Sequence, residues 1–92
     1  MDLYAYRDEV KAFLQRMNAP DEGIATKIKF LEEEFALLKS AVGANDPDKI
    51  QHQVYDMLFQ LFGIAAEYDF DLVTEWDTGR ERKERKYIKK SL

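Results

Sequence analysis

The chain has no cysteine and, among its 92 residues, only two prolines and four glycines. Without cysteine, neither a disulfide nor a thiolate zinc site can stabilise the fold. A chain of this size buries only about 60–65% of its unfolded surface. We therefore expect a single small domain over residues 1–92. Part of its core is expected to come from association into a homodimer or a higher homo-oligomer.

Long apolar runs are also missing. No stretch of about 18 apolar residues is present, and no signal-peptide pattern opens the chain, so we expect a cytoplasmic protein without a membrane partner. The net charge of −4 is unevenly distributed: residues 80–92 hold seven Lys/Arg against two Glu, or +5, which leaves −9 for the rest. Because the larger part is acidic, nucleic acid is not an expected partner.

Helical periodicity and capping residues divide the chain into short-linked segments. We expect helices over residues 2–17, 23–42, 47–68 and 72–77, with a turn over 18–23 in which Asp21 is a candidate cap. Thr78 and Glu81 match a capping box, so residues 79–92 are expected to form a separate basic helix or a frayed tail. Because no strand pattern is present, the sequence predicts an all-α antiparallel bundle of about four helices.

Two of these helices carry long apolar seams. The seam of the central helix comprises Ile24, Ile28, Leu31, Phe35, Leu38 and Val42, and that of the next helix comprises Ile50, Val54, Met57, Leu61, Ile64 and Tyr68. Further apolar residues widen the second seam over almost the whole circumference. We therefore expect the middle of the third helix to be buried on several sides.

Acidic residues interrupt both seams. Glu33 and Glu34 lie in the central helix, and Asp56 lies in an apolar stretch of the next. Two antiparallel helices can direct such carboxylates at one another, and Mg²⁺ takes oxygen ligands of this kind. The alternative is that Asp56 pairs with a lysine such as Lys27 or Lys49 and that the glutamates are solvated. The spacing of the acids leaves both interpretations open.

The segment FLEEEFALLKSAVGANDPDKIQHQVYDMLFQLFGIAAEYDFDL, about half of the chain, resembles the core of a known family. It is similar to the MazG-like all-α nucleoside triphosphate pyrophosphohydrolases, which include relatives of phosphoribosyl-ATP pyrophosphohydrolase. That family carries Glu-Glu-x-x-Glu on one helix and Glu-x-x-Asp on the next. Its carboxylates bind Mg²⁺, which holds the triphosphate while water attacks between the α- and β-phosphates.

The resemblance implies a site and an activity. Glu33, Glu34 and Asp56 would be catalytic and would bind Mg²⁺, or Mn²⁺ as an alternative, and Gln53 could add a carbonyl oxygen. Leu37 and Gln53 stand where the family has glutamates. The implied function is therefore a Mg²⁺-dependent pyrophosphohydrolase, weakened by these losses, that converts a nucleoside triphosphate to the monophosphate and pyrophosphate. The alternative is a catalytically degenerate member that acts as a binding or interaction module.

Basic residues complete the predicted site. The family places basic residues after its last helix to hold phosphates, and Arg80 and Lys83 come nearest to that place. Lys29, just before the glutamates, is a further candidate for substrate binding. The alternatives are a basic tail that is solvated or docked on the acidic body, and ordinary i,i+4 pairing for the lysine.

Overall fold

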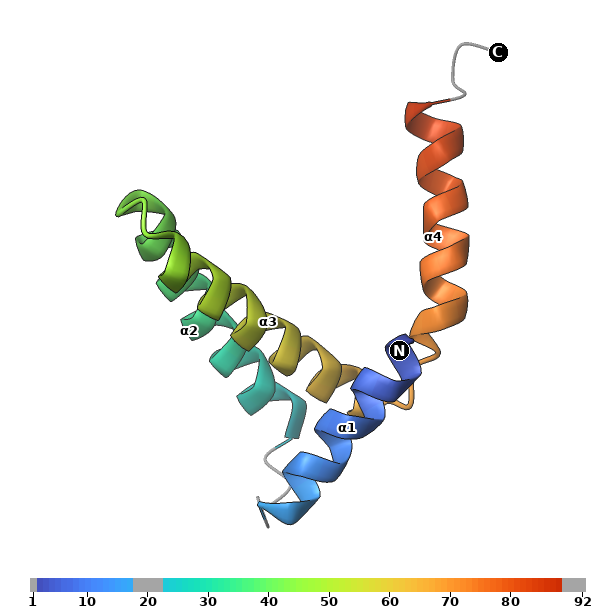
Figure 1. Ribbon diagram of the computed structural model, residues 1–92. Helices are drawn as coiled ribbons and strands as arrows, with labels where there is room; N and C mark the ends of the chain where they lie inside the picture. Colours follow the sequence, from blue (N-terminus) through green and yellow to red (C-terminus); the bar gives the residue numbers. More distant parts are fainter. Residues whose placement is uncertain (1, 18–22, 89–92) are drawn as a thin grey trace.

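The computed structural model describes residues 2–17 and 23–88, which form four α-helices and no strand. The helices are α1 (Leu3–Arg16), α2 (Gly23–Gly43), α3 (Pro47–Glu67) and α4 (Leu72–Tyr87) (Figure 1). The prediction of an all-α fold is confirmed. Residues 18–22, which include the candidate cap Asp21, lie outside the described residues. None of the described helices is long and apolar enough to cross a membrane.

Aspartate side chains cap three of the helices. Asp2 accepts a hydrogen bond from the backbone N–H of Ala5 (2.9 Å), and Asp46 accepts one from Lys49 (3.2 Å). In the same way, the side chain of Asp71 accepts a hydrogen bond from the backbone N–H of Thr74 and caps the start of α4. Each cap satisfies a backbone N–H that has no partner within its helix. The caps at Asp46 and Asp71 agree with the helix starts predicted from the sequence.

The predicted break near Thr78 is absent. α4 continues without interruption from Leu72 to Tyr87, so the prediction of a separate helix beginning at residue 79 was wrong. An ion pair between Glu75 and Arg82 (3.1 Å) spans the expected break. A continuous helix keeps its backbone hydrogen bonds through this region, whereas a new start would leave several N–H and C=O groups without partners. Residues 89–92 lie outside the described part of the chain.

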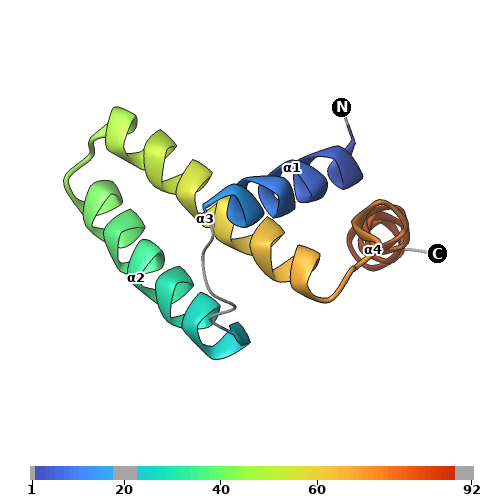
Figure 2. The same ribbon diagram turned by 90° about the horizontal axis from the view of Figure 1, so that it is seen from below.

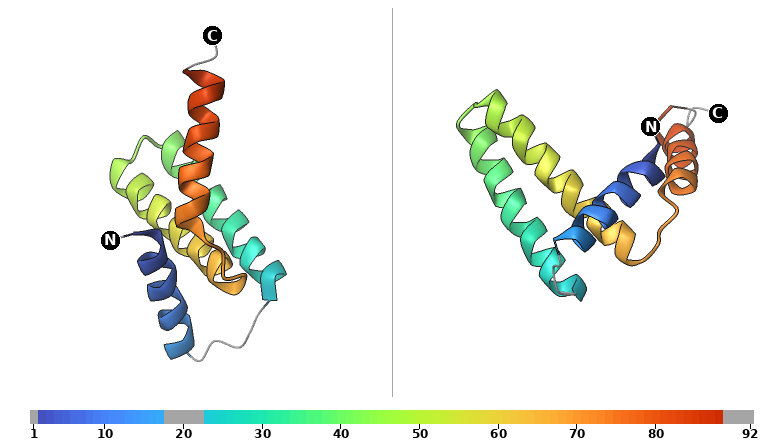
Figure 3. Two further views of the ribbon diagram at one scale, coloured as in Figure 1. Left: turned by 90° about the vertical axis from the view of Figure 1, so that its right-hand side faces the viewer. Right: turned by 60° about the horizontal axis from the view of Figure 1, so that its bottom comes forward.

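The helices are packed together unevenly. α2 and α3 form an antiparallel hairpin, α1 crosses α3, and α4 projects away beyond the start of α1 (Figures 1 and 2). The right-hand view of Figure 3 shows the same separation of α4 from α2. The radius of gyration is 16.0 Å, whereas a compact domain of this length has about 12 Å. The single chain is therefore open rather than a closed four-helix bundle.

Small residues form the centre of the packing. The buried apolar residues are Val10, Ala41, Ala65 and Ala66, and no large side chain of the described residues is fully buried. Gly63 lies where α1 crosses α3, and a methyl group placed there would come within 3.7 Å of Leu14. Two ring pairs extend the contact of α1 with α3: Tyr6 stacks on Phe62, and Phe13 meets Phe59 edge-on. The small residues let the helices approach closely, but they bury little apolar area.

Half of each apolar seam stays uncovered in the single chain. Phe35 on α2 is 49% exposed and Leu61 on α3 is 47% exposed. The prediction that the middle of the third helix is buried on several sides is therefore wrong for one copy of the chain. Among the described helices, α2 and α1 are the main neighbours of α3, and they leave a third side open.

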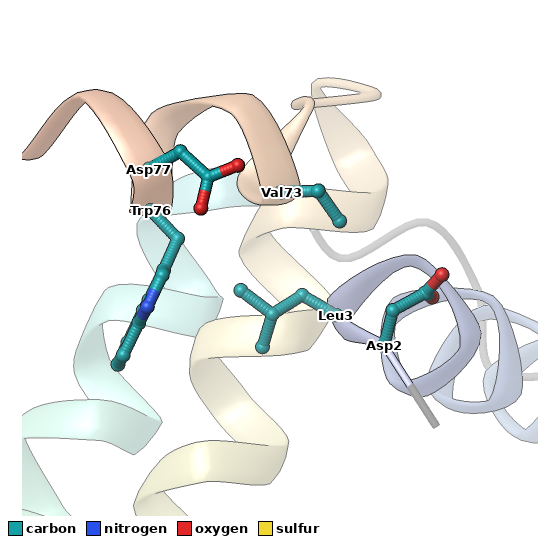
Figure 4. Close-up of a pocket in the computed structure, with 5 residues that line it drawn as sticks. All are labelled: Asp2, Leu3, Val73, Trp76 and Asp77. Carbon is teal, nitrogen blue, oxygen red and sulfur yellow. The ribbon is translucent and has the colours of Figure 1, made fainter. Parts of the chain in front are cut away.

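The start of α4 is attached to α1 by polar contacts and a small apolar one. Arg7 donates a hydrogen bond to the carbonyl of Phe70 (2.9 Å). Tyr4 hydrogen bonds to Asp71, which raises the pKa of the tyrosine. Leu3 extends toward Val73 and Trp76 in a pocket of about 240 Å³ (Figure 4). Trp76 is nevertheless 64% exposed, so this junction is shallow.

Candidate functional site

Glu34 is the one member of the acidic run Glu32–Glu34 that faces α3. It lies on the side of α2 that also carries the buried Ala41, because seven residues are about two helical turns. Its Oε2 atom is buried and has no hydrogen-bond partner among the described residues. Desolvation by burial raises the pKa of this carboxyl, and the nearby charge of Asp56 raises it further. The fold therefore holds a carboxylate in a place that disfavours its charge.

Asp56 approaches the same point from α3. Its Oδ2 lies 3.1 Å from Nε2 of His52, one helical turn earlier, and the two form an ion pair when the histidine is protonated. Of the two lysines named as alternative partners of Asp56, Lys27 pairs with Glu67 instead (2.7 Å). When Glu34 carries a proton, it can donate it in a hydrogen bond to Asp56, which is one of the causes of its raised pKa.

Gln53 adds a third oxygen to this junction of α2 and α3. It lies one turn before Asp56 on α3, and its Oε1 atom is also buried, with no hydrogen-bond partner in residues 2–17 and 23–88. Buried oxygens of this kind cost free energy unless a donor or a cation satisfies them. Three of the four predicted metal ligands, Glu34, Gln53 and Asp56, thus belong to the region where the two helices meet.

Glu33 does not share this environment. It is exposed, and its charge acts on Glu34 only by raising the pKa of that neighbour. Successive residues of a helix point about 100° apart, so only one of two adjacent glutamates can face α3. In keeping with this, residues 2–17 and 23–88 contain no group of three or more His, Cys, Asp or Glu side chains that could hold a metal ion.

The donor set suits a weakly held hard cation rather than a closed metal site. Glu34 and Asp56 supply carboxylates and Gln53 supplies an amide oxygen, all of which are ligands that Mg²⁺ accepts. Mg²⁺ keeps several waters and is commonly bound by one or two carboxylates together with substrate phosphates. The two unpaired buried oxygens fit such an ion, although the protein alone provides few charges for it.

The predicted basic residues lie elsewhere. Lys29 is exposed on α2, whereas Arg80 and Lys83 are exposed on α4. Because α4 projects away from the α2–α3 hairpin, the structure does not bring Arg80 and Lys83 to Glu34 and Asp56 of the same chain (Figure 1). Leu37, in a position where the resembled family has an acid, is 50% exposed beside the acidic junction.

Sequence reasoning missed the cleft between α1 and the hairpin. It has a volume of about 840 Å³ and is lined by apolar residues of all three helices, among them Phe13, Phe30 and Phe59. The ion pair between Lys27 and Glu67 stands at its wall. The antiparallel pairing of the two helices could have predicted this ion pair, since a register that sets residue 34 opposite 56 also brings residue 27 near 67.

Comparisons with known proteins do not assign the chain to a family. No protein-family model matches it, and neither curated proteins nor solved structures give a significant match. The resemblance to the MazG-like pyrophosphohydrolases therefore remains a prediction from the sequence.

Proposed function

We propose that the protein is a Mg²⁺-dependent nucleoside triphosphate pyrophosphohydrolase with a reduced set of metal ligands. The observation that supports this proposal is the meeting of Glu34 and Asp56 between two antiparallel helices, where the Oε2 atom of Glu34 and the Oε1 atom of Gln53 are buried and find no hydrogen-bond partner among the described residues. A carboxylate whose ionisation the fold disfavours gains when a cation binds next to it. The residues that would hold the ion are Glu34, Asp56 and Gln53, with Glu33 at the exposed edge.

The protein's own groups would bind and orient the substrate. Lys29 is on the same helix as the acidic run and could contact a phosphate oxygen at its exposed edge. Apolar surface beside the junction, including Leu37 and Phe30, could contact the nucleoside. When bound, Mg²⁺ would neutralise phosphate charge and favour attack by water, yielding the monophosphate and pyrophosphate.

The second candidate is an interaction module that has kept the helices and lost the chemistry. Leu37 and Gln53 in place of glutamates favour it, and so does the absence of a three-ligand metal group from the described residues. Fewer ligand charges weaken divalent-ion binding, so the two candidates differ first in whether the ion binds at all.

One experiment separates the two candidates. Purified protein is incubated with a panel of nucleoside triphosphates and Mg²⁺ or Mn²⁺, and released pyrophosphate is measured. We expect turnover that Glu34→Gln and Asp56→Asn each reduce by at least tenfold. Glu9→Gln, an exposed glutamate on α1, is the matched control and should leave the rate unchanged. Turnover that is equal in the wild type and in Glu34→Gln would exclude the proposed site.

A melting experiment tests the ion without requiring turnover. An ion that binds only the folded state raises the melting midpoint. We expect millimolar Mg²⁺ to raise the midpoint of the wild type and to leave that of Glu34→Gln unchanged. If the wild type does not respond, the interaction-module candidate is favoured.

A further inference from the structure

One side of the α2–α3 hairpin presents a continuous apolar surface. On α2, Ile28, Phe35 and Val42 recur every seven residues and therefore lie on one side of the helix. On α3, steps of four and three place Val54, Leu58 and Leu61 on one side as well. All six side chains are exposed, and we call them the hairpin face.

The hairpin face lies opposite the side that α1 covers. Phe30 and Phe59 point to the α1 side, since both line the cleft with α1. On α2, Phe35 lies about 140° around the helix from Phe30. On α3, Leu58 lies about 100° from Phe59, away from α1. Phe35 follows Phe30 along α2, whereas Leu58 precedes Phe59 along α3, so the two rotations have opposite senses along their own helices. Because the helices run antiparallel, both rotations lead to the same uncovered side of the hairpin.

The area of the chain shows how much covering is missing. The accessible surface is 7285 Å², whereas a compact monomer of this mass exposes roughly 5,500 Å². Part of the excess belongs to the projecting α4. The whole excess, about 1,800 Å² per chain, exceeds the roughly 800 Å² that each partner buries in an interface of standard size. The exposed surface is thus large enough to include an interface of standard size.

The pattern of the hairpin face matches itself after a half-turn. Ile28 and Val42 each stand seven residues from Phe35, so reversing α2 about Phe35 exchanges these two apolar positions. The same reversal brings an acidic position close to a basic one, because Glu32 precedes Phe35 by three residues and Lys39 follows it by four. A surface that pairs with its own copy needs this self-complementarity.

We propose that the hairpin face binds the same face of a second copy, with a two-fold axis at right angles to the helices and passing beside Phe35. α2 then lies antiparallel to α2 of the other copy, and α3 lies antiparallel to α3, which gives an intermolecular four-helix bundle. Phe35 meets its equivalent at the axis. Glu32 of each copy comes beside Lys39 of the other, whose ammonium already lies near the face, 5.4 Å from the Phe35 ring centroid.

The oligomeric state tests the face. Sedimentation or light scattering at micromolar concentration should give the mass of a dimer for the wild type and of a monomer for Leu58→Glu. Leu37→Glu is the matched control, because Leu37 is similarly exposed but lies on the other side of α2, and it should remain dimeric. A monomeric wild type, or equal dissociation by both variants, would overturn the proposal.

Cross-linking tests the axis independently of stability. The chain has no native cysteine, so a single introduced one can react only with its equivalent. Phe35→Cys should form a disulfide-linked dimer on mild oxidation, and Leu37→Cys should not, because a disulfide needs Cα atoms about 4.4–6.8 Å apart. Equal cross-linking of both variants contradicts this axis. A second result would also contradict it: Phe35→Cys protein that forms a disulfide only after it is mixed with Leu58→Cys protein.

A charge exchange tests the proposed ion pairs. Glu32→Lys places like charges together at two symmetric points and should weaken the dimer several-fold. The double variant Glu32→Lys, Lys39→Glu should restore wild-type association. If the double variant dimerises no better than Glu32→Lys alone, the two residues do not meet across the interface.

Discussion

The α2–α3 hairpin and α4 are both helical, but different forces maintain them. The hairpin has apolar seams at helical spacing, and with α1 it contains every buried residue of the described chain. The apolar residues of α4 are Leu72, Val73 and Trp76 in its first turns and Tyr87 at its end, and none of them is buried. Its start is fixed by Asp71, Tyr4 and Arg7, and the remainder carries charges along an exposed helix. Capping and charge pairing can thus begin and extend a helix, whereas packing requires a periodic apolar face.

The largest expected effect comes from placing a new charge in each of the two regions and comparing the losses of stability. Ala65→Asp would bury an unpaired carboxylate at a site on α3 that is 3% exposed, and should lower the free energy of unfolding by about 3 kcal/mol or more. Thr78→Asp, exposed on α4, should change it by less than about 0.5 kcal/mol. Urea unfolding followed by circular dichroism measures both. Similar losses would mean that α4 contributes to the core.

A smaller effect concerns the buried acid of the hairpin. Glu34→Gln removes a charge that the fold disfavours and supplies an amide N–H that can donate to Asp56. It should therefore stabilise the protein at pH 7 by about 1 kcal/mol, the order of one hydrogen bond. Since the pKa of Glu34 is raised in the folded state, the wild type gains stability as the pH falls through that pKa toward the ordinary value of 4.5. The advantage of the variant should therefore disappear at acid pH.

Thermal melts of wild type and Glu34→Gln between pH 4 and pH 8 measure this difference. Glu33→Gln is the control, because the exposed Glu33 should give no comparable gain. A stabilisation by Glu34→Gln that is independent of pH would show that the ionisation of Glu34 is not its cause.

The smallest expected effect concerns the start of α4. The backbone N–H of Thr74, then the side chains of Tyr4 and Thr74, lower the pKa of Asp71 to about 2. Because this pKa is depressed, the contribution of Asp71 is present above its ordinary value of 3.8 and is lost as the pH falls toward about 2. Asp71→Asn should speed amide hydrogen exchange in the first turn of α4 and leave the hairpin unchanged.

Nuclear magnetic resonance can check both parts of this last prediction. Titration of the Asp71 carboxyl should give a midpoint well below that of an ordinary aspartate. Faster exchange in α2 or α3 of Asp71→Asn would contradict the separation of α4 from the hairpin.

The candidate site was predictable only in part. The acidic residues stood out because they interrupt apolar seams, and antiparallel pairing indicated that Glu33 or Glu34 would meet Asp56. The sequence did not show which of two adjacent glutamates faces α3, since that depends on the rotation of α2 set by its packing. It also did not show that α4 carries Arg80 and Lys83 away from these acids, because the direction of a helix after a short link depends on tertiary contacts such as that of Arg7 with Phe70.

Local chemistry in the sequence by itself determined the all-α class, the starts of α3 and α4, and the residues available for a site. Aspartate caps, proline at a first helical position and apolar periodicity act over a few residues, so they can be recognised without the fold. Only the tertiary structure decided which half of each seam is covered, which acid is desolvated and where α4 points. These features depend on contacts between residues distant in sequence, and in a chain with so small a core those contacts leave the hairpin face open.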